Sequence, residues 1–419
     1  MIDAPAQQQG GRAVAFARRR RRREAAERRF RRVAFAATWL AAGCLALLLA
    51  NMLVEGIGGF RETRIALPLD LAAARLPITR AQLVGRGADL ALAGAGLEAA
   101  VDGAARAAYG PDGDRLIGDE AWLAVRAAVK ADPELLSRRA IYTVPASAGI
   151  DLAAKAEGTA ADEAAVERLR ARDALSIGFD GGFITGSDAT DPVRIGIWGA
   201  LKGSLLTMAV TFALAVPIGV LAALYLEEYA PQNRWTALIE VSINNLAAVP
   251  SIIFGLLGLA MFLGTLHLPR SAPLVAGLTL ALMTMPVIVI AGRGAIRGVP
   301  PSIRDAALAV GASPVQVVFH HVLPLALPGI LTGTIIGMAR ALGETAPLLM
   351  IGMRAFIASP PRGFTDPATV LPVQIFLWSD QIDRGFVERT SAAILVLLAV
   401  LLAMNAAAIR LRDRFEARR

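Results

Sequence analysis

Six stretches of about 20 apolar residues most constrain what this chain can fold into. A segment of that length crosses the hydrocarbon core of a bilayer as a helix. The six stretches lie at residues 33–54, 197–226, 239–263, 274–292, 325–351 and 392–409. Hydrophobic residues make up 55% of the 419 residues, more than is usual for a soluble protein. We therefore expect an all-α polytopic membrane protein with six transmembrane helices.

Basic residues flank these apolar stretches and predict the topology. The net charge is +8, and arginines concentrate at 18–32 and 410–419. Because Lys and Arg favour cytoplasmic flanks, both termini are expected in the cytoplasm, in contact with membrane lipid and not with nucleic acid. Alternation then places 55–195 and 352–390 outside and 293–324 inside. The loop at 227–234 is slightly acidic and does not contribute to this assignment.

The long polar segment between the first and second spans divides the chain into parts. We expect a basic cytoplasmic arm at 1–32, a first transmembrane helix at 33–54, a periplasmic insert at 55–195, a transmembrane domain at 196–410 and a cytoplasmic tail at 411–419. The insert mixes Ala-rich helical stretches with short strand-like ones, which predicts a small α/β or α+β domain.

The composition indicates neither a metal site nor a cofactor. A single cysteine excludes an intramolecular disulfide framework, and three histidines leave little for zinc. The insert shows no constellation of catalytic residues. We therefore expect no catalytic residues, no metal ligands and no cofactor.

Prolines within the apolar stretches predict local breaks in the helices. They are Pro217, Pro250, Pro286 and Pro347. A broken membrane helix needs neighbouring protein to satisfy the freed backbone groups, which a simple anchor would not supply. The alternative is that proline is merely more frequent in membrane helices than in soluble ones.

The fifth span carries a face of small residues followed by two ionisable ones. Gly329, Gly333 and Gly337 recur every fourth residue, so another helix can approach closely there. The same face reaches Arg340 and Glu344, which we expect to point into the protein interior. Each would cost about 2.5–3.5 kcal/mol at a helix centre facing lipid. A guanidinium suits an oxyanion, although the pair could also simply neutralise itself and support packing.

The predicted cytoplasmic segment 300–324 reads as a helix, a turn and a helix. Ser302 with Asp305 forms a near capping box, and Gly311 suits a left-handed helix end. Ser313 with Pro314 begins a second helix. The apolar face of the first helix is formed by Ile303, Ala306, Ala307 and Val310.

This short first helix needs a surface to pack on, and Pro324 is expected to interrupt the second helix. A cytoplasmic partner would supply the surface, and lipid headgroups are the alternative. No phosphate-binding G-x-x-x-x-G-K-[ST] loop occurs in the sequence. If ATP drives this protein, a separate subunit must bind and hydrolyse it, so the chain itself is not expected to be an enzyme.

Four segments resemble a known family of transporters. The pattern D-A-A-x-x-x-G with a terminal L-P, at 305–324, resembles the EAA loop of ABC-importer permeases, with Asp305 in place of the usual Glu. YLEEYAP at 225–231, NLAAVPSIIFGLLGL at 245–259 and ARALGETAPLL at 339–349 resemble the A-type permeases of the phosphate-specific transport system, the PstA family. The resemblance covers 187–410, and FITGSDATDP at 183–192 is similar to a subgroup with an N-terminal extension.

The resemblance implies the six-helix, MetI-like fold of type I ABC-importer permeases in a bacterial inner membrane. It implies three partners: a second, C-type phosphate permease, a cytoplasmic ATPase dimer and a periplasmic phosphate-binding protein. Arg340 and Glu344 would line the translocation path, with Arg293 at its cytoplasmic end. The residues expected to couple to the ATPase are Arg304, Asp305, Ala306, Ala307, Gly311 and Pro314.

Two other functions remain open at this point. An arginine recognises sulfate and molybdate as well as phosphate, so the substrate could be another oxyanion. A membrane-anchored sensor or scaffold, whose outer insert is the working part, belongs to a different class. The paired ionisable residues and the docking loop weigh against the sensor.

Overall fold

The computed structural model describes the backbone of residues 4–416, apart from 75, 79–81, 84–86, 156–157, 354–355 and 358. Side chains at 4–22, 24–25 and 415–416 are also not described. The first three residues of the expected arm and the last three of the tail therefore lie outside the described residues. The chain forms two units, Met1–Val54 and Glu55–Arg419, which we describe separately.

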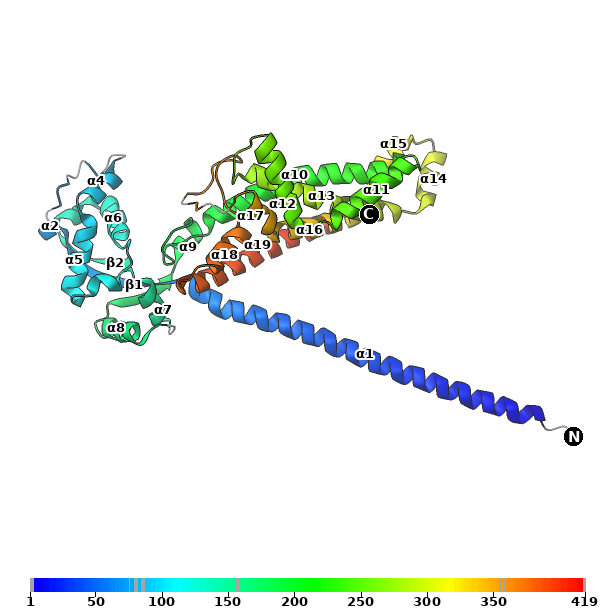
Figure 1. Ribbon diagram of the computed structural model, residues 1–419, viewed down its shortest axis with the longest axis horizontal. Coiled ribbons are helices and arrows are strands. Elements are labelled where there is room, and N and C mark those ends of the chain that lie inside the picture. The colour runs from blue at the N-terminus through cyan, green and yellow to red at the C-terminus, as the bar shows by residue number, and fades with distance from the viewer. Residues whose placement is uncertain are drawn as a thin grey trace. The chain divides into compact units, whose positions relative to one another are not determined.

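The first unit consists of one long helix. Helix α1 runs over Ala4–Gly59, so its last five residues belong to the second unit (Figure 1). Its stretch Ala26–Gly59 is long and apolar enough to cross a membrane. The helix therefore includes the expected first span at 33–54 and extends beyond both of its ends.

The insert contains a three-stranded antiparallel sheet. Strand β1 (Arg61–Asp70) lies between β2 (Arg139–Pro145) and β3 (Leu175–Phe179). Ile65 stands opposite Val144 on one side and Leu175 on the other. Alternate residues of β1 are buried, as expected for a strand with one covered face. The predicted mixed helix-and-strand insert is confirmed.

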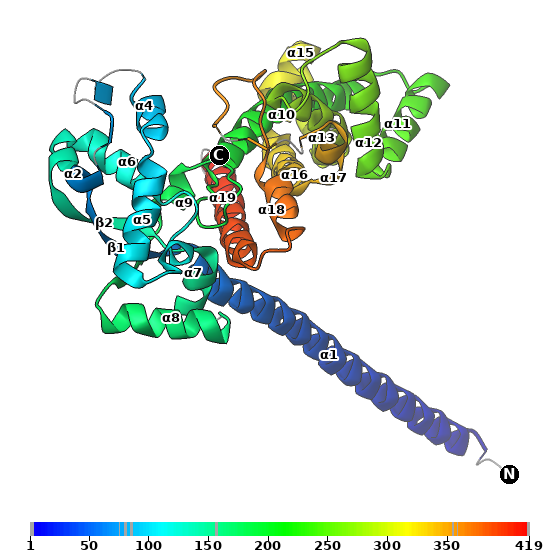
Figure 2. The same cartoon turned by 60° about the vertical axis from the view of Figure 1, so that its left-hand side comes forward.

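Helices cover the buried face of this sheet, and Figure 2 shows them gathered around β1 and β2. Their apolar residues form one core with Ile65, Leu67 and Val144. The helices are α2 (Leu71–Ala74), α4 (Ala88–Gly94), α5 (Leu97–Tyr109), η1 (Gly113–Leu116), α6 (Trp122–Ala131), η2 (Pro133–Ser137), α7 (Ala148–Ala154) and α8 (Ala160–Ala171). The short helix α9 (Gly181–Thr185) follows β3, and its Phe183 packs in a separate core with Trp378.

The remainder of the chain is helical. Its elements are α10 (Trp198–Leu224), η3 (Tyr225–Tyr229), α11 (Arg234–Ala247), α12 (Ser251–Gly258), η4 (Leu259–Thr265), α13 (Pro273–Arg297), α14 (Pro301–Ala309), α15 (Pro314–Gln316), η5 (Val317–Val322), α16 (Leu323–Gly343), α17 (Ala346–Met350), α18 (Leu371–Ser379) and α19 (Gly385–Glu416). Within the described residues, five helices can span a membrane. A sixth span results if Arg234–Ala247 and Ser251–Thr265, bent by 101° at their junction, count as one.

The four prolines behave in two ways. Pro250 lies at the bend between α11 and α12, and Pro347 lies in the first turn of α17, just after a break. The breaks expected at Pro217 and Pro286 are absent, because both residues lie inside continuous helices. Those helices, α10 and α13, pack closely: a Cβ added at Gly277 would lie 2.4 Å from Val210. This packing holds both helices across the single hydrogen bond that each proline removes.

Buried ion pairs join the insert to the start of α19. The Arg389 side chain is 2% exposed and donates to Asp180 at 2.7 Å. Lys155 of the insert contacts Glu388 at 2.7 Å and Asp151 at 2.8 Å. Arg389 also donates to the backbone carbonyls of Gly59, Pro192 and Val193. These bonds hold the end of α1, the insert and α19 together.

Candidate functional site

The three glycines of the fifth span lie against α13. A Cβ added at Gly333 would lie 2.1 Å from the Ala291 Cβ, and one added at Gly329 would lie 2.6 Å from the Ala295 Cβ. At Gly337 the nearest atom would be Thr284 Cγ2, at 3.1 Å. Helices α13 and α16 therefore approach at a distance that only glycine permits at 329 and 333. This packing fixes the helix that carries Arg340.

Arg340 and Glu344 lie side by side, with Arg340 Nε 3.3 Å from Glu344 Oε1. The Arg340 side chain is 50% exposed and that of Glu344 is 17% exposed. The expectation that both point into the interior of this chain is therefore not met by Arg340, which lies on its surface. Helix α16 ends at Gly343, so Glu344 lies beyond the helix with extended backbone.

The exposed guanidinium is suited to contact something outside this chain. Glu344 accepts from Nε, and within the described residues no second bond to the other guanidinium nitrogens is formed. These nitrogens form the fork that matches the oxygens of phosphate or sulfate. Glu344 therefore orients the Arg340 guanidinium near the end of α16, and the terminal nitrogens remain accessible.

The segment after α13 contains the predicted helix, turn and helix, with one change at its start. Helix α14 begins after Pro300 without a side-chain cap, so the predicted cap at Ser302 is wrong. Pro301 occupies the first turn instead, where its missing N–H costs nothing. Gly311 has φ +88°, which confirms the predicted left-handed turn.

The apolar face of α14 is divided. Ala307 is buried and Ile303 packs partly against the same core, as predicted. Val310 is 86% exposed, however, because it follows the end of the helix and no longer keeps its periodicity. Leu308 and Val315, which are close to Val310 in the sequence, are also exposed, at 48% and 56%.

The second helix begins as expected and continues where a break was predicted. Ser313 and Gln316 form a reciprocal capping box directly around Pro314. The helix then continues to Gly343 through the π-helical segment η5, so Pro324 does not interrupt it. The wider π-turn relieves the clash of the Pro324 ring with the preceding turn.

The residues expected to couple to an ATPase lie on this segment with different exposures. Ala307 is buried and Arg304 is half-buried, whereas the others face outward. The exposed ones are Asp305, Ala306, Gly311 and Pro314.

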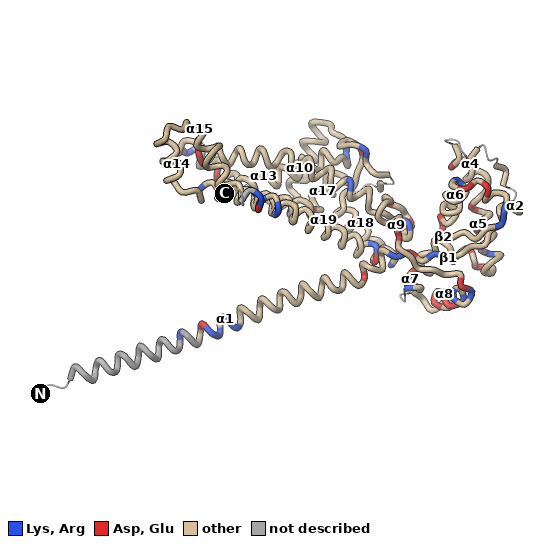
Figure 3. Tube along the Cα trace, turned by 180° about the vertical axis from the view of Figure 1, so that it is seen from behind, with Lys and Arg blue, Asp and Glu red and all other residues tan. Residues whose placement is uncertain are grey.

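Arg293 lies in an ion-pair cluster at the same end of the helices. Its Nε is 2.5 Å from Glu227 Oε1 and its Nη2 is 2.6 Å from Glu240 Oε1. Arg297 also contacts Glu227, at 2.8 Å. Figure 3 shows acidic and basic residues gathered beside α14. The Arg293 side chain is 9% exposed and lies within ion-pair distance of both carboxylates.

Glu227 and Glu228 are the site residues that sequence reasoning missed. Arg304 Nη2 lies 2.6 Å from Glu228 Oε1, which links α14 to the end of α10. The slightly acidic loop was uninformative for topology. The sequence did contain a signal for this cluster: two adjacent carboxylates in a loop that the alternation of spans places on the same side of the membrane as Arg293, Arg297 and Arg304.

Comparison with known proteins identifies the family. Residues 215–419 match the family described as "Binding-protein-dependent transport system inner membrane component". The phosphate transport system permease protein PstA 1 of Mycobacterium tuberculosis (strain CDC 1551 / Oshkosh) is 34% identical over 218 residues, which cover 52% of this chain and 70% of that protein. The chain is an ABC transporter permease. It is thus a multi-pass component of an inner membrane, and ATP hydrolysis belongs to a separate ATPase subunit.

Other matches cover different shares of the permease. The probable ABC transporter permease protein YqgI of Bacillus subtilis (strain 168) is 34% identical over 185 residues, 44% of this chain and 61% of that protein. A chain of the MetNI methionine ABC transporter in an inward-facing conformation has TM-score 0.42 and 19% identity, over 52% of this chain and 97% of its own. Residues 17–163 match a "Domain of unknown function (DUF3333)".

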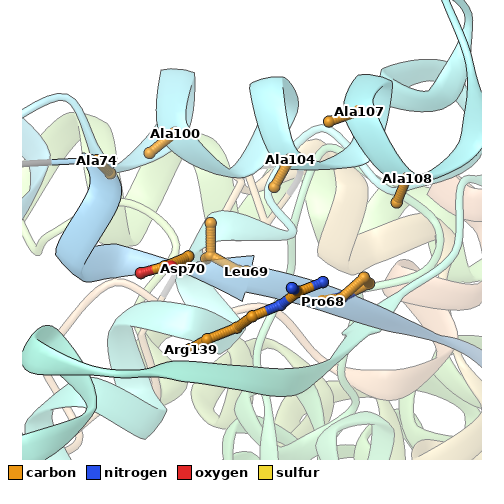
Figure 4. A pocket seen from close by; sticks show the side chains of 9 residues that line it. All are labelled: Pro68, Leu69, Asp70, Ala74, Ala100, Ala104, Ala107, Ala108 and Arg139. Atoms are coloured by element: carbon orange, nitrogen blue, oxygen red, sulfur yellow. The ribbon is translucent and has the colours of Figure 1, made fainter.

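The permease's insert also contains a groove of about 380 Å³ between α5 and the strands. Figure 4 shows alanine side chains of α5 above Leu69, with Asp70 from β1 and Arg139 from β2 at the strand side. These two residues are the charged ones in a lining that is otherwise small and apolar. Among the described residues, no three His, Cys, Asp or Glu side chains are placed to hold a metal ion.

Proposed function

We propose that this permease carries inorganic phosphate inward across a bacterial inner membrane, as half of the path of an ATP-driven importer. The observation that carries the proposal is the 34% identity with PstA 1 of Mycobacterium tuberculosis over 70% of that protein. The half-exposed position of Arg340 agrees with an oxyanion as substrate, because the N–H donors of an accessible guanidinium match the oxygens of phosphate or sulfate.

Arg340 is the residue that we propose contacts the passing phosphate, and Glu344 holds its guanidinium in position. The bond to Glu344 uses Nε and leaves the terminal nitrogens to the ligand. Arg293 was expected at the cytoplasmic end of the path. We now propose that it stabilises the helices around the coupling loop instead, because Glu227 and Glu240 already neutralise it.

The loop at 300–324 is proposed to dock on the separate ATPase. Its exposed surface combines Leu308, Val310 and Val315 with the acidic Asp305. Burial of these three exposed apolar side chains against the ATPase would favour docking. Closure of the ATPase would pull on this loop and rock the spans between inward-open and outward-open states.

The complete importer in this proposal holds three further components: a C-type permease that forms a heterodimer with this chain, an ATPase dimer and a periplasmic phosphate-binding protein. Both termini lie in the cytoplasm and the insert lies in the periplasm, as the distribution of arginines favours. We propose the same division of the chain into an arm, a first helix, an insert, a transmembrane domain and a tail, with bounds at 1–32, 33–54, 55–195, 196–410 and 411–419.

Uptake of radiolabelled phosphate and sulfate by cells that carry variants of this chain tests the proposal. Gly311→Pro forces the loop out of φ +88°, since proline requires a φ near −65°. We expect selective loss of phosphate uptake at normal membrane abundance. Gly294→Ala is the matched control, because a Cβ there meets nothing within 4 Å. Unchanged phosphate uptake in Gly311→Pro, or loss of sulfate uptake alone, would contradict the proposal.

A further inference from the structure

We propose that Glu227 and Glu228 transmit the movement of α14 to three membrane helices, so that they act as positioning residues for transport. The inference rests on the proposed coupling role of the loop at 300–324. Both carboxylates come from η3, the π-helical turn that ends α10. Such turns frequently mark functional positions in helices.

Glu228 connects α14 to α10. Arg304 donates to Glu228 from Nη2 at 2.6 Å and from Nε at 3.2 Å, a two-pronged contact that fixes both side chains. The same guanidinium donates to the carbonyls of Val299 and Ile296, at 2.7 and 3.1 Å. Arg304 therefore also holds the last turn of α13, and among the described side chains of α14 it is the one that forms an ion pair.

Glu227 connects α10 to α13 and, through Arg293, to α11. It accepts from Arg293 at 2.5 Å and from Arg297 at 2.8 Å. Arg293 in turn lies 2.6 Å from Glu240, which belongs to α11. A displacement of α14 would thus act directly on α10 through Glu228 and on α13 through the Ile296 carbonyl. It would reach α11 through two further side chains, Glu227 and Arg293.

The cluster balances its charges under partial burial. Three carboxylates face three guanidiniums, namely Glu227, Glu228 and Glu240 against Arg293, Arg297 and Arg304. Glu227, Glu228 and Arg293 are each no more than 10% exposed. Removing one charge leaves its partner uncompensated in a poorly hydrated place, so the connection would loosen and not simply be replaced by water.

Apolar packing offers a competing route for the same movement. Ala307 and Ile303 of α14 pack against the core that contains Val299 and Ala223. If that packing alone transmits the movement, the ion pairs serve only to hold the fold. The two explanations differ in what loss of a carboxylate does to the ratio of phosphate moved to ATP hydrolysed.

The experiment measures that ratio in proteoliposomes that contain the complete transporter with its binding protein. Glu228→Gln keeps the size and one acceptor oxygen while removing the charge. We expect ATP hydrolysis to persist while the ratio falls at least about fivefold, the lower end of typical coupling effects. Arg304→Lys, which keeps the charge and loses the two-pronged contact, should lower the ratio as well and provides a second, milder variant.

Glu388→Gln is the matched control. Glu388 is also 10% exposed and ion-paired, with Lys155, but it lies at the other end of the helices. It should lower thermal stability and leave the ratio unchanged. An unchanged ratio in both Glu228→Gln and Arg304→Lys would overturn the proposal while phosphate uptake by the unaltered transporter still stands. Absence of phosphate uptake by the unaltered transporter would overturn the proposed function, and this inference with it.

Discussion

Arg340 shows how one side chain links the packing of this permease to its proposed substrate. The close approach of α13 and α16 holds the backbone of α16, and Glu344 holds the guanidinium at 3.3 Å. Spacing along the sequence predicted this pair, because residues four apart in a helix are neighbours. The half-exposed position of Arg340 was not predictable, because it depends on which neighbouring elements cover that face of α16.

Replacing Arg340 by glutamine is expected to reduce phosphate uptake by about tenfold to a hundredfold, the effect of losing a charge-assisted hydrogen bond of about 1.5–3 kcal/mol. The measurement is initial uptake rate at equal membrane abundance. Arg362→Gln, in the exposed loop before α18, is the control and should have no effect. Equal uptake by Arg340→Gln and the unaltered permease would contradict the proposal that Arg340 contacts phosphate in the translocation path.

Asp191 gives a pH-dependent prediction outside the membrane spans. Burial raises the pKa of this carboxyl above its usual range, and the negative charges of Asp119 and Asp383 raise it further. The folded state therefore holds the proton more tightly than the unfolded state. Its stabilising contribution is complete below the unfolded pKa of about 3.9 and is lost as the pH rises through the folded pKa.

We accordingly expect Asp191→Asn to raise the thermal unfolding temperature at pH 7, with the gain shrinking as the pH falls toward 4. Asparagine keeps an acceptor oxygen for the Val193 N–H, which Asp191 binds at 2.9 Å. Asp112→Asn, at a carboxylate that is 80% exposed, should show no such trend. A gain that grew with falling pH would have the wrong sign and would contradict the assignment.

Among the elements, the helix pair α13 and α16 approaches closely at glycines of α16. Gly333→Ala would place a Cβ 2.1 Å from the Ala291 Cβ, so the helices must separate. We expect the free energy of unfolding to fall by about 1–3 kcal/mol, the usual cost of overpacking. Thermal unfolding in detergent measures it.

A compensating change makes this prediction specific. Ala291→Gly removes the opposing methyl group, so the double variant should recover most of the lost stability despite the weaker helix propensity of glycine. Gly343→Ala, where a Cβ meets nothing within 4 Å, should be neutral. If the double variant were no more stable than Gly333→Ala alone, the contact would not be the cause.

Local chemistry predicted some element boundaries and not others. The left-handed Gly311 and the capping Ser313 were predictable because turn and cap preferences depend on the residue itself. The uninterrupted course of the helix through Pro324 was not, since the π-turn before it depends on tertiary packing. The roles of Glu227 and Glu228 after α10 were also not predictable, because they depend on contacts with arginines of α13 and α14.

At the scale of the whole molecule, the insert and the last membrane helix form one block around Arg389. Arg389→Gln would leave the Asp180 carboxylate, 6% exposed, without its cation. We expect a loss of about 3–5 kcal/mol in stability, typical of breaking a buried ion pair. Arg138→Gln breaks a surface pair with Asp132, in which the side chains are 58% and 45% exposed, and should cost at most about 1 kcal/mol.

Limited proteolysis combined with thermal unfolding checks this prediction, because loosening of the block should expose the segment around Asp180 to cleavage first. Equal stability of Arg389→Gln and Arg138→Gln would show that the block is held by its apolar contacts alone. Those contacts include Phe183 and Trp378, whose rings lie 6.5 Å apart.

The global outline followed from apolar runs and charge, because membrane helices must satisfy their backbone internally and so appear in sequence as long apolar segments. The six predicted apolar stretches correspond, within the described residues, to five continuous candidate spans and one bent pair of helices. The mixed insert was recognisable, but its strand order β2-β1-β3 was not, since it joins residues 61–70 with 139–145 and 175–179. Long-range pairing of this kind leaves no local pattern.

Phosphate transport by this permease is tested by ATP-driven uptake of radiolabelled phosphate into proteoliposomes that contain the complete transporter. We expect uptake that requires ATP, persists in excess sulfate and molybdate, and falls about tenfold to a hundredfold in Arg340→Gln. Uptake of sulfate or molybdate in place of phosphate, or phosphate uptake that does not need ATP, would contradict the proposed function.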